Sequence, residues 1–180
     1  MSHGYDPRPP APAGPALGLI GKAMEWTNRL LLVPCMVALI AASAILTYSV
    51  LVRYFYKVPT DWQDEASVFL LVGATFLSGA YVQSMRGHIG IEALAGLLPP
   101  AVNRVRLILV DAAGGAFCLF FAWKCWGMLH EAWVEGQTSS SSWGPPLWIP
   151  YSTMALGMSL LALQLLLHLA GRLAAWRAGA

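Results

Sequence analysis

The segment from Arg53 to Glu92 reads RYFYKVPTDWQDEASVFLLVGATFLSGAYVQSMRGHIGIE, and it decides the fold. Charged residues gather around Trp62 and lead directly into an apolar run, 66–85, which ends at Arg86. A helix needs about 20 apolar residues to cross the hydrocarbon core of a bilayer. The segment therefore predicts one membrane-spanning helix that carries charged residues at both of its ends.

Composition places the whole chain in the membrane class. Of its 180 residues, 57% are hydrophobic and 11% are charged, whereas soluble domains average about 25% charged residues. The net charge of +2 is too small to indicate a nucleic acid partner, so we expect membrane phospholipids around the chain and no bound nucleic acid. The three cysteines fall within apolar runs, and their odd number predicts neither a disulfide framework nor a metal site.

Further apolar runs are long enough to cross a bilayer. Together with the run that follows Trp62, they predict an all-α integral membrane protein with four transmembrane helices. The predicted spans are about 30–52, 66–85, 107–129 and 147–169.

Two shorter segments have apolar residues at helical spacing but are too short to cross a membrane. These segments, 17–29 and 89–98, predict one or two interfacial amphipathic helices that lie along the membrane surface. The Pro/Ala/Gly-rich residues 1–16 predict a disordered tail. We therefore expect a single four-helix membrane domain at 17–172, with that tail before it and a short tail, 173–180, after it.

The basic residues predict the orientation of the chain. Eight of the eleven Lys and Arg residues precede the first span, lie between the second and third spans, or follow the fourth. Since basic residues are enriched on the cytoplasmic side of a membrane, we expect a multi-pass membrane protein with both termini in the cytoplasm. The outer loops are then 53–65 and 130–146, and the serine run 139–142 in the second loop predicts a flexible segment.

The sequence contains no Ser/His/Asp set, zinc motif or phosphate-binding loop, so we predict no catalytic, substrate-binding or metal-binding residue, no cofactor and no enzyme activity. One carboxylate, Asp111, lies inside the third span, and charged groups in a span are candidates for function. It lies five residues after Arg106, about 7 Å along a helix, which places it near the inner membrane surface. Two interpretations stay open: pairing with a cytoplasmic-side arginine, or a role linked to ion coupling.

Histidines raise an alternative function, a four-helix membrane haem b protein in electron transfer. Its candidate ligands are His88, His130 and His168, but axial histidines must face each other at similar depth. His88 and His168 fall at the inner ends of their spans, and His130 falls at the opposite side. A small proton-coupled exporter is a further alternative; it needs a carboxylate deep in a span, and the first span, 30–52, contains none.

The charged residues at the ends of the second span predict a structural role. Arg53 ends the first span, while Trp62 and Glu65 open the second on neighbouring positions of one helix face. We interpret them as a clamp in which an Arg53–Glu65 ion pair closes the outer end of a helical hairpin; helix capping with an arginine anchor is the simpler interpretation. At the inner end, Arg86 and His88 are predicted to fix the turn into the surface helix.

These features, in this order, resemble the small membrane subunit (DctQ-like) of tripartite ATP-independent periplasmic (TRAP) transporters. The resemblance covers roughly residues 22–172, and its strength lies in the order of several short motifs on a four-span frame. The matching segments are Arg53–Phe55, Pro59–Glu65 with its Trp-x-x-Glu, Ser78–Ala80, Arg86–Glu92, Leu147–Tyr151 and Ala155–Gly157.

The resemblance implies a role for the chain. A small subunit of this family is a non-catalytic scaffold that binds a large multi-span membrane subunit, which holds the substrate and sodium sites and moves as an elevator. A periplasmic substrate-binding protein delivers the solute, usually an organic acid. The resemblance therefore implies two protein partners, a location in the bacterial inner (cytoplasmic) membrane, and no chemistry in this chain.

Overall fold

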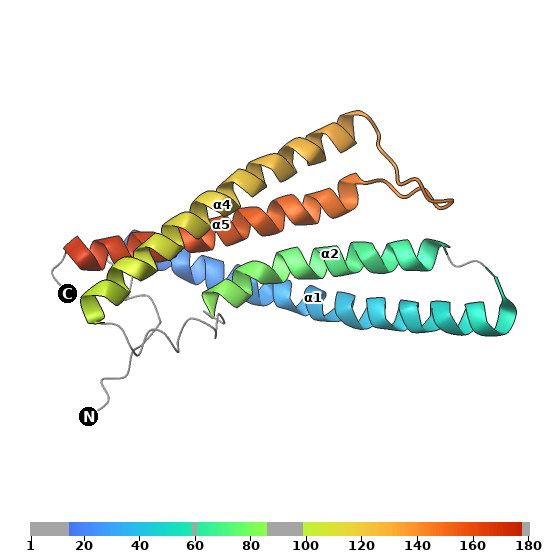
Figure 1. Ribbon diagram of the computed structural model, residues 1–180, viewed down its shortest axis with the longest axis horizontal. Helices are drawn as coiled ribbons and strands as arrows, with labels where there is room; N and C mark the ends of the chain where they lie inside the picture. Colours follow the sequence, from blue (N-terminus) through green and yellow to red (C-terminus); the bar gives the residue numbers. More distant parts are fainter. Residues whose placement is uncertain (1–14, 59–60, 86–98, 178–180) are drawn as a thin grey trace, which may run out of the picture.

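The structure, a computed structural model, describes residues 15–58, 61–85 and 99–177. These residues form four helices, α1 (Pro15–Tyr56), α2 (Asp61–Ser84), α4 (Pro100–Val134) and α5 (Trp148–Arg177) (Figure 1). Each helix is long and apolar enough to cross a membrane. The predicted fold class, an all-α membrane protein with four spans, is confirmed.

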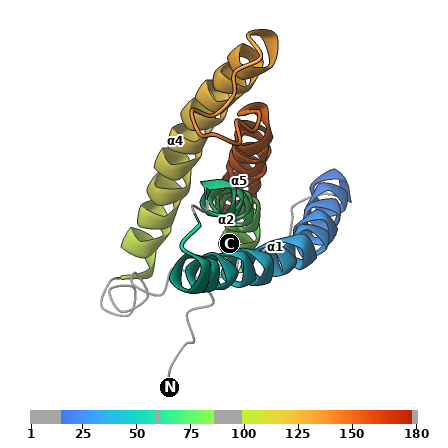
Figure 2. The ribbon, with the colours of Figure 1, turned by 90° about the vertical axis from the view of Figure 1, so that its right-hand side faces the viewer.

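Helix α1 is longer than the sequence predicts. Residues 17–29 are helical, but they continue into the first span without a break, so they form no separate element. Pro34 lies inside this helix, and α1 curves along its length (Figure 2). A proline inside a helix removes one backbone hydrogen bond and bends the helix. The predicted surface helix at 89–98 and residues 1–14 of the predicted tail lie outside the described residues.

The helices are arranged as an open row in the order α1, α2, α5, α4. Helix α5 packs along α4 on one side and along α2 on the other, and α1 packs along α2 with only a short contact to α5. An end-on view shows α1 and α4 on opposite sides of the α2–α5 pair (Figure 2). The most apolar stretch of α5 is 44% buried, against 11% for α1. Helix α5 is therefore the central helix, and α1 and α4 are the two edges of the row.

The buried residues on one face of α1 follow a seven-residue repeat. Asn28, Cys35, Ala42 and Ser49 of α1 are all at most 3% exposed, and each lies seven residues after the one before it. Burial at a period of 3.5 residues is typical of helices that wind around each other in a left-handed sense. One face of α1 is thus buried against the other helices along most of its length.

The contacts of α5 depend on small residues. Ala155 and Ala162 are at most 1% exposed, and the core around them includes the buried Cys118 and Cys125 of α4. At Gly157 helices α5 and α2 approach closely, because an added Cβ would clash with the backbone carbonyl of Phe76 in α2. Close approach of this kind provides the van der Waals contact that holds helices together in lipid.

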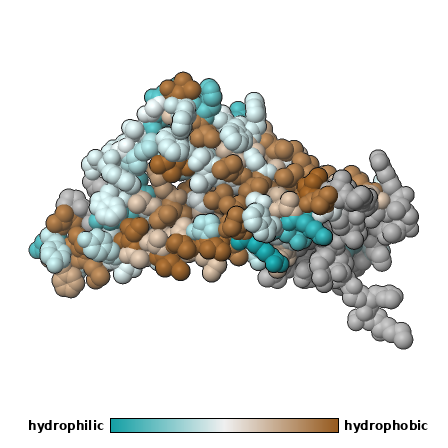
Figure 3. All heavy atoms as spheres, turned by 180° about the vertical axis from the view of Figure 1, so that it is seen from behind, coloured by the Kyte–Doolittle hydropathy of each residue, from teal (hydrophilic) through white to brown (hydrophobic). Residues whose placement is uncertain are grey.

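Large hydrophobic side chains cover much of the outer surface. Brown hydrophobic atoms spread over the middle of the face opposite to that of Figure 1, and hydrophilic atoms lie mainly toward its margins (Figure 3). Among the exposed residues are Ile40 and Phe117, at 70% and 61%. Such a surface needs an apolar environment, which lipid or another membrane protein supplies.

Replacing Gly157 by alanine is expected to destabilise the fold, because the added methyl group meets the backbone of Phe76 rather than a side chain that can move. Overpacking of this kind costs about 1–3 kcal/mol. The measurement is the thermal unfolding midpoint of the detergent-solubilised protein. The matched control is Gly127→Ala on α4, where nothing lies within 4 Å of the added atom. Equal midpoints for the two variants would contradict the close contact.

Candidate functional site

Polar side chains gather at both ends of the row. The loop end holds the end of α1, the start of α2 and the loop 135–147 between α4 and α5 (Figure 1). The terminal end holds the start of α1 and the end of α5. The predicted clamp residues lie at the loop end, and Asp111 lies nearer the terminal end.

At the loop end, Arg53 pairs with Asp64. The guanidinium nitrogen lies 3.3 Å from the Asp64 carboxylate, and it also donates to the Ser49 hydroxyl at 3.4 Å. Ser49 in turn donates to Asp64 at 3.4 Å. The sequence predicts Glu65 as the partner of Arg53, and this prediction is wrong. Successive residues of a helix point about 100° apart, so Asp64 faces α1 while Glu65 faces another part of the chain.

Glu65 instead contacts the loop between α4 and α5. Its carboxylate accepts a hydrogen bond from the Ser141 hydroxyl, 76 residues further along the chain. Beside it, the rings of Trp62 and Trp143 meet edge to face with centroids 6.4 Å apart. The two residues that open α2 therefore connect this helix to the loop that precedes α5.

The loop 135–147 is an ordered turn, whereas its serine run predicts flexibility. Ser139 donates its backbone N–H to the Pro145 carbonyl at 2.9 Å, and Leu147 donates to Gln137 at 3.0 Å. Gly144 has a φ of 58°, a left-handed conformation that glycine adopts without strain. Backbone pairing across the loop, which residue composition does not reveal, gives it this order.

Asp111 is buried between α4 and α5. Its carboxylate lies 2.8 Å from Nε of Arg172, and the two side chains are 2% and 10% exposed. This geometry agrees with the first of the two interpretations of Asp111, in which its carboxylate pairs with an arginine near the predicted cytoplasmic side. A lone charge at this depth would be costly, so the pair fixes the register of α4 against α5.

A second buried polar group connects α1 to α5. Asn28 of α1, only 1% exposed, donates to Gln164 at 3.5 Å. Gln164 lies 2.9 Å from Nε2 of His168. The apolar runs give no sign of this group, but its spacing does: Gln164, His168 and Arg172 are four residues apart, which places them on one face of a helix.

The described histidines do not form a haem site. His130 is exposed near the loop end, while His168 is buried near the terminal end with Gln164 against its Nε2 atom. His88 and Arg86 lie outside the described residues. Among the residues that the structure describes, no three His, Cys, Asp or Glu residues come together in a way that would hold a metal ion.

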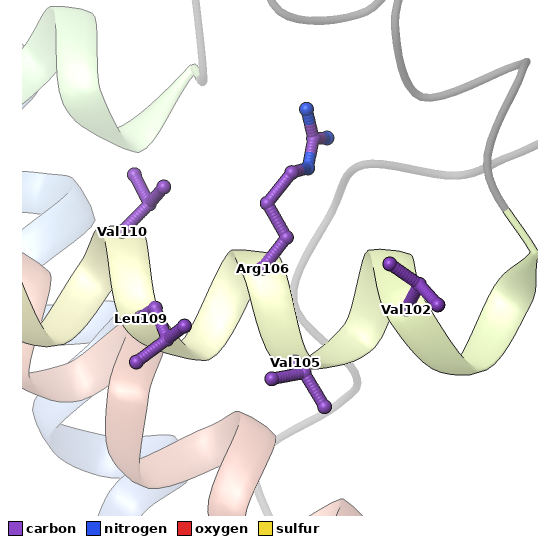
Figure 4. Close-up of a pocket in the computed structure, with 5 residues that line it drawn as sticks. All are labelled: Val102, Val105, Arg106, Leu109 and Val110. Atoms are coloured by element: carbon purple, nitrogen blue, oxygen red, sulfur yellow. The ribbon is translucent and has the colours of Figure 1, made fainter.

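A hollow of about 520 Å³ lies on α4 near the terminal end. Val102, Val105, Leu109 and Val110 line it together with Arg106, whose side chain extends away from the helix (Figure 4). Ligand sites usually enclose most of the ligand between several elements. Every described lining residue belongs to one helix, so this hollow is a feature of the outer surface.

Comparison with known proteins identifies the family. The family model described as "Tripartite ATP-independent periplasmic transporters, DctQ component" matches residues 42–175. The chain belongs to this family. The matched range includes the Arg53–Asp64 pair, the Glu65–Ser141 contact and the Asp111–Arg172 pair, and it begins after Asn28. The chain is therefore a small permease subunit of a TRAP transporter.

Two relatives agree with this assignment. The C4-dicarboxylate TRAP transporter small permease protein DctQ of Vibrio cholerae is 22% identical over 147 residues, which cover 69% of this chain and 63% of that protein. The isethionate TRAP transporter permease protein DctMQ of Oleidesulfovibrio alaskensis is 24% identical over 162 residues, or 86% of this chain and 25% of that protein. The chain thus matches less than two thirds of the length of either relative.

Changing Asp111 to asparagine is expected to destabilise this DctQ subunit strongly, because Arg172 would keep its buried charge without the carboxylate at 2.8 Å. Removing one member of a buried pair costs about 3–5 kcal/mol. The double change Asp111→Leu with Arg172→Met replaces both charges by apolar groups and should recover most of the loss. Both effects are measured by unfolding in detergent. A double variant as unstable as Asp111→Asn would argue against a buried ion pair.

Changing Ser141 to alanine is expected to loosen the loop 135–147, because Glu65 loses the hydroxyl that donates to it. A hydrogen bond to a charged group contributes about 1.5–3 kcal/mol, so amide hydrogen exchange at Ser139 and Leu147 should accelerate about tenfold or more. The matched control is Ser140→Ala, an exposed neighbour. Equal exchange rates in the two variants would show that Ser141 does not order the loop.

Proposed function

We propose that this small permease subunit is a non-catalytic scaffold in a sodium-coupled, binding-protein-dependent secondary transporter for organic acids. It supports a large membrane subunit that moves as an elevator. The observation that carries the proposal is the open row of helices in a chain that belongs to the DctQ family. A row with two exposed edges offers a wide surface to a membrane partner, and its own contacts hold it rigid.

A static support has to be rigid, and three contacts among the described residues make this bundle rigid. The close approach at Gly157 joins α2 to α5. The buried pair of Asp111 and Arg172 joins α4 to α5. The bond between Glu65 and Ser141 joins α2 to the loop before α5. Coupled contacts of this kind favour one arrangement of the helices, against which a moving partner can slide.

The relatives support the choice of partner and solute class. The match covers only 25% of the Oleidesulfovibrio protein, whose name joins DctM and DctQ. This supports a separate large membrane subunit as the partner of the present chain, and a periplasmic substrate-binding protein completes the proposed transporter. One relative is named for a C4-dicarboxylate and the other for isethionate. Both are organic acid anions, which supports that class of solute.

Charge distribution supports an orientation with both termini in the cytoplasm of a bacterium. Lys22 and Arg172 lie toward the terminal end, while Asp64 and Glu65 lie at the loop end. Lys124 lies on the part of α4 nearer the loop end, with its ammonium group 4.7 Å from the ring centre of Trp123. A lysine beside a tryptophan is typical of the membrane–water boundary.

We propose that the predicted clamp acts through two sets of contacts at the loop end. Arg53 with Asp64 holds α1 against α2, and Trp62 with Glu65 holds α2 against the loop 135–147. Because the Arg53 and Asp64 side chains are 60% and 56% exposed, we expect their pair to contribute less than about 1 kcal/mol. The proposed roles of Arg86 and His88 at the other end of α2 are unchanged.

The full transporter tests the proposed function. The tagged chain is expected to co-purify with a larger multi-span protein encoded beside it. Proteoliposomes that contain both proteins should take up an organic acid only when the binding protein and an inward sodium gradient are present. Proteoliposomes with either membrane protein alone serve as controls. Uptake by this chain alone, or uptake that does not respond to sodium, would contradict the proposal.

A further inference from the structure

Helix α1 is too long to lie inside the membrane. Its 42 residues extend about 63 Å at 1.5 Å per residue, whereas the hydrocarbon core is about 30 Å thick. Even at a tilt of about 40°, the upper end of the usual range, about 26 residues cross the core. About 16 residues of α1 therefore lie at or beyond the membrane surface. The part before Pro34 carries Lys22, Glu25 and Arg29, whereas the last turn carries Arg53.

One stripe of this segment faces away from the other helices. Leu19, Trp26 and Val33 are 71%, 69% and 61% exposed, and Lys22 and Arg29 between them are also exposed. At about 100° per residue, all five fall within an arc of about 80°. We call Leu19, Lys22, Trp26, Arg29 and Val33 the α1 stripe.

The opposite side of the same turns is fixed against the protein. Met24 is 5% exposed and Asn28 is 1% exposed, and Asn28 donates to Gln164 of α5. The helix therefore cannot rotate without breaking a buried contact. The α1 stripe is held outward, with apolar, aromatic and cationic side chains presented together.

We propose that the α1 stripe binds anionic phospholipid headgroups in the leaflet at the terminal end. Lys22 and Arg29 are seven residues apart, or about 10 Å along the helix, so they reach separate phosphates. Trp26 lies between them on the same stripe, and tryptophan prefers the headgroup level. Val33, the residue of the stripe nearest the span, contacts the upper acyl chains.

Glu25 is the acidic residue that flanks the stripe. It is exposed, and it forms no ion pair with Lys22 or Arg29 within the described part of α1. Its charge opposes phosphate binding, so removing it should strengthen binding while removing either cation should weaken it. This proposal requires only that the chain lies in a membrane, and it is independent of the transported solute and of the protein partner.

Lipid binding to the purified full-length chain tests the proposal. Native mass spectrometry in mild detergent compares phosphatidylglycerol with phosphatidylcholine of the same acyl chains. Each basic residue near an anionic surface is worth about fivefold in affinity. The double variant Lys22→Gln/Arg29→Gln should therefore bind phosphatidylglycerol about 30-fold more weakly, with phosphatidylcholine binding unchanged. Glu25→Gln should bind phosphatidylglycerol several-fold more tightly.

The matched control removes two cations from the other half of the molecule. Lys57→Gln/Lys124→Gln makes the same change of charge at exposed positions and should keep the preference for phosphatidylglycerol. If both double variants lost the same amount of phosphatidylglycerol affinity, the effect would depend on net charge alone, and the proposal would be overturned. So would a double α1-stripe variant that keeps its lipid preference but no longer co-purifies with the large subunit, since a protein would then occupy the stripe.

Discussion

The contact between Gly157 and Phe76 sets the position of α5, and the other helices depend on it. A Cβ at residue 157 would clash with the backbone carbonyl of Phe76 in α2, so the two helices approach backbone to backbone. In lipid the hydrophobic effect does not drive helices together, and close packing has to supply the stabilisation. Helix α5 packs along α2 and α4 and also touches α1, so it contacts every other described helix and is the most buried of the four.

Polar side chains then fix how far each neighbour slides along α5. Gln164, His168 and Arg172 share one face of this helix; Gln164 bonds to Asn28 of α1, and Arg172 bonds to Asp111 of α4. Packing of small residues alone permits several registers that differ by a turn. A buried ion pair permits only the register that brings its two charges together. Close packing of small residues thus holds the helices together, and the polar pairs align them along their axes.

The sequence predicts the spans well because hydropathy is a local property. The apolar runs, the acids that open α2 and the small residues on α5 are all visible in the sequence. Which side chains meet is not local. Asp64 rather than Glu65 faces Arg53 because of the rotation of α2 about its axis. The order of the loop 135–147 depends on pairing across the loop and on a glutamate 76 residues away. The sequence does not predict that α1 is continuous, because residues 17–29 have the mixed polarity of a surface helix. The same mixed polarity is compatible with the first turns of a longer helix.

The open row has a consequence for how solute specificity is divided between chains. The described helices form a layer one helix thick, so they enclose no lumen through which a solute would pass. Substitutions that change which solute is carried would have no reason to accumulate in the buried contacts of α5. We therefore expect one such layer to serve transporters of chemically different solutes with little more than a change of its exposed edges.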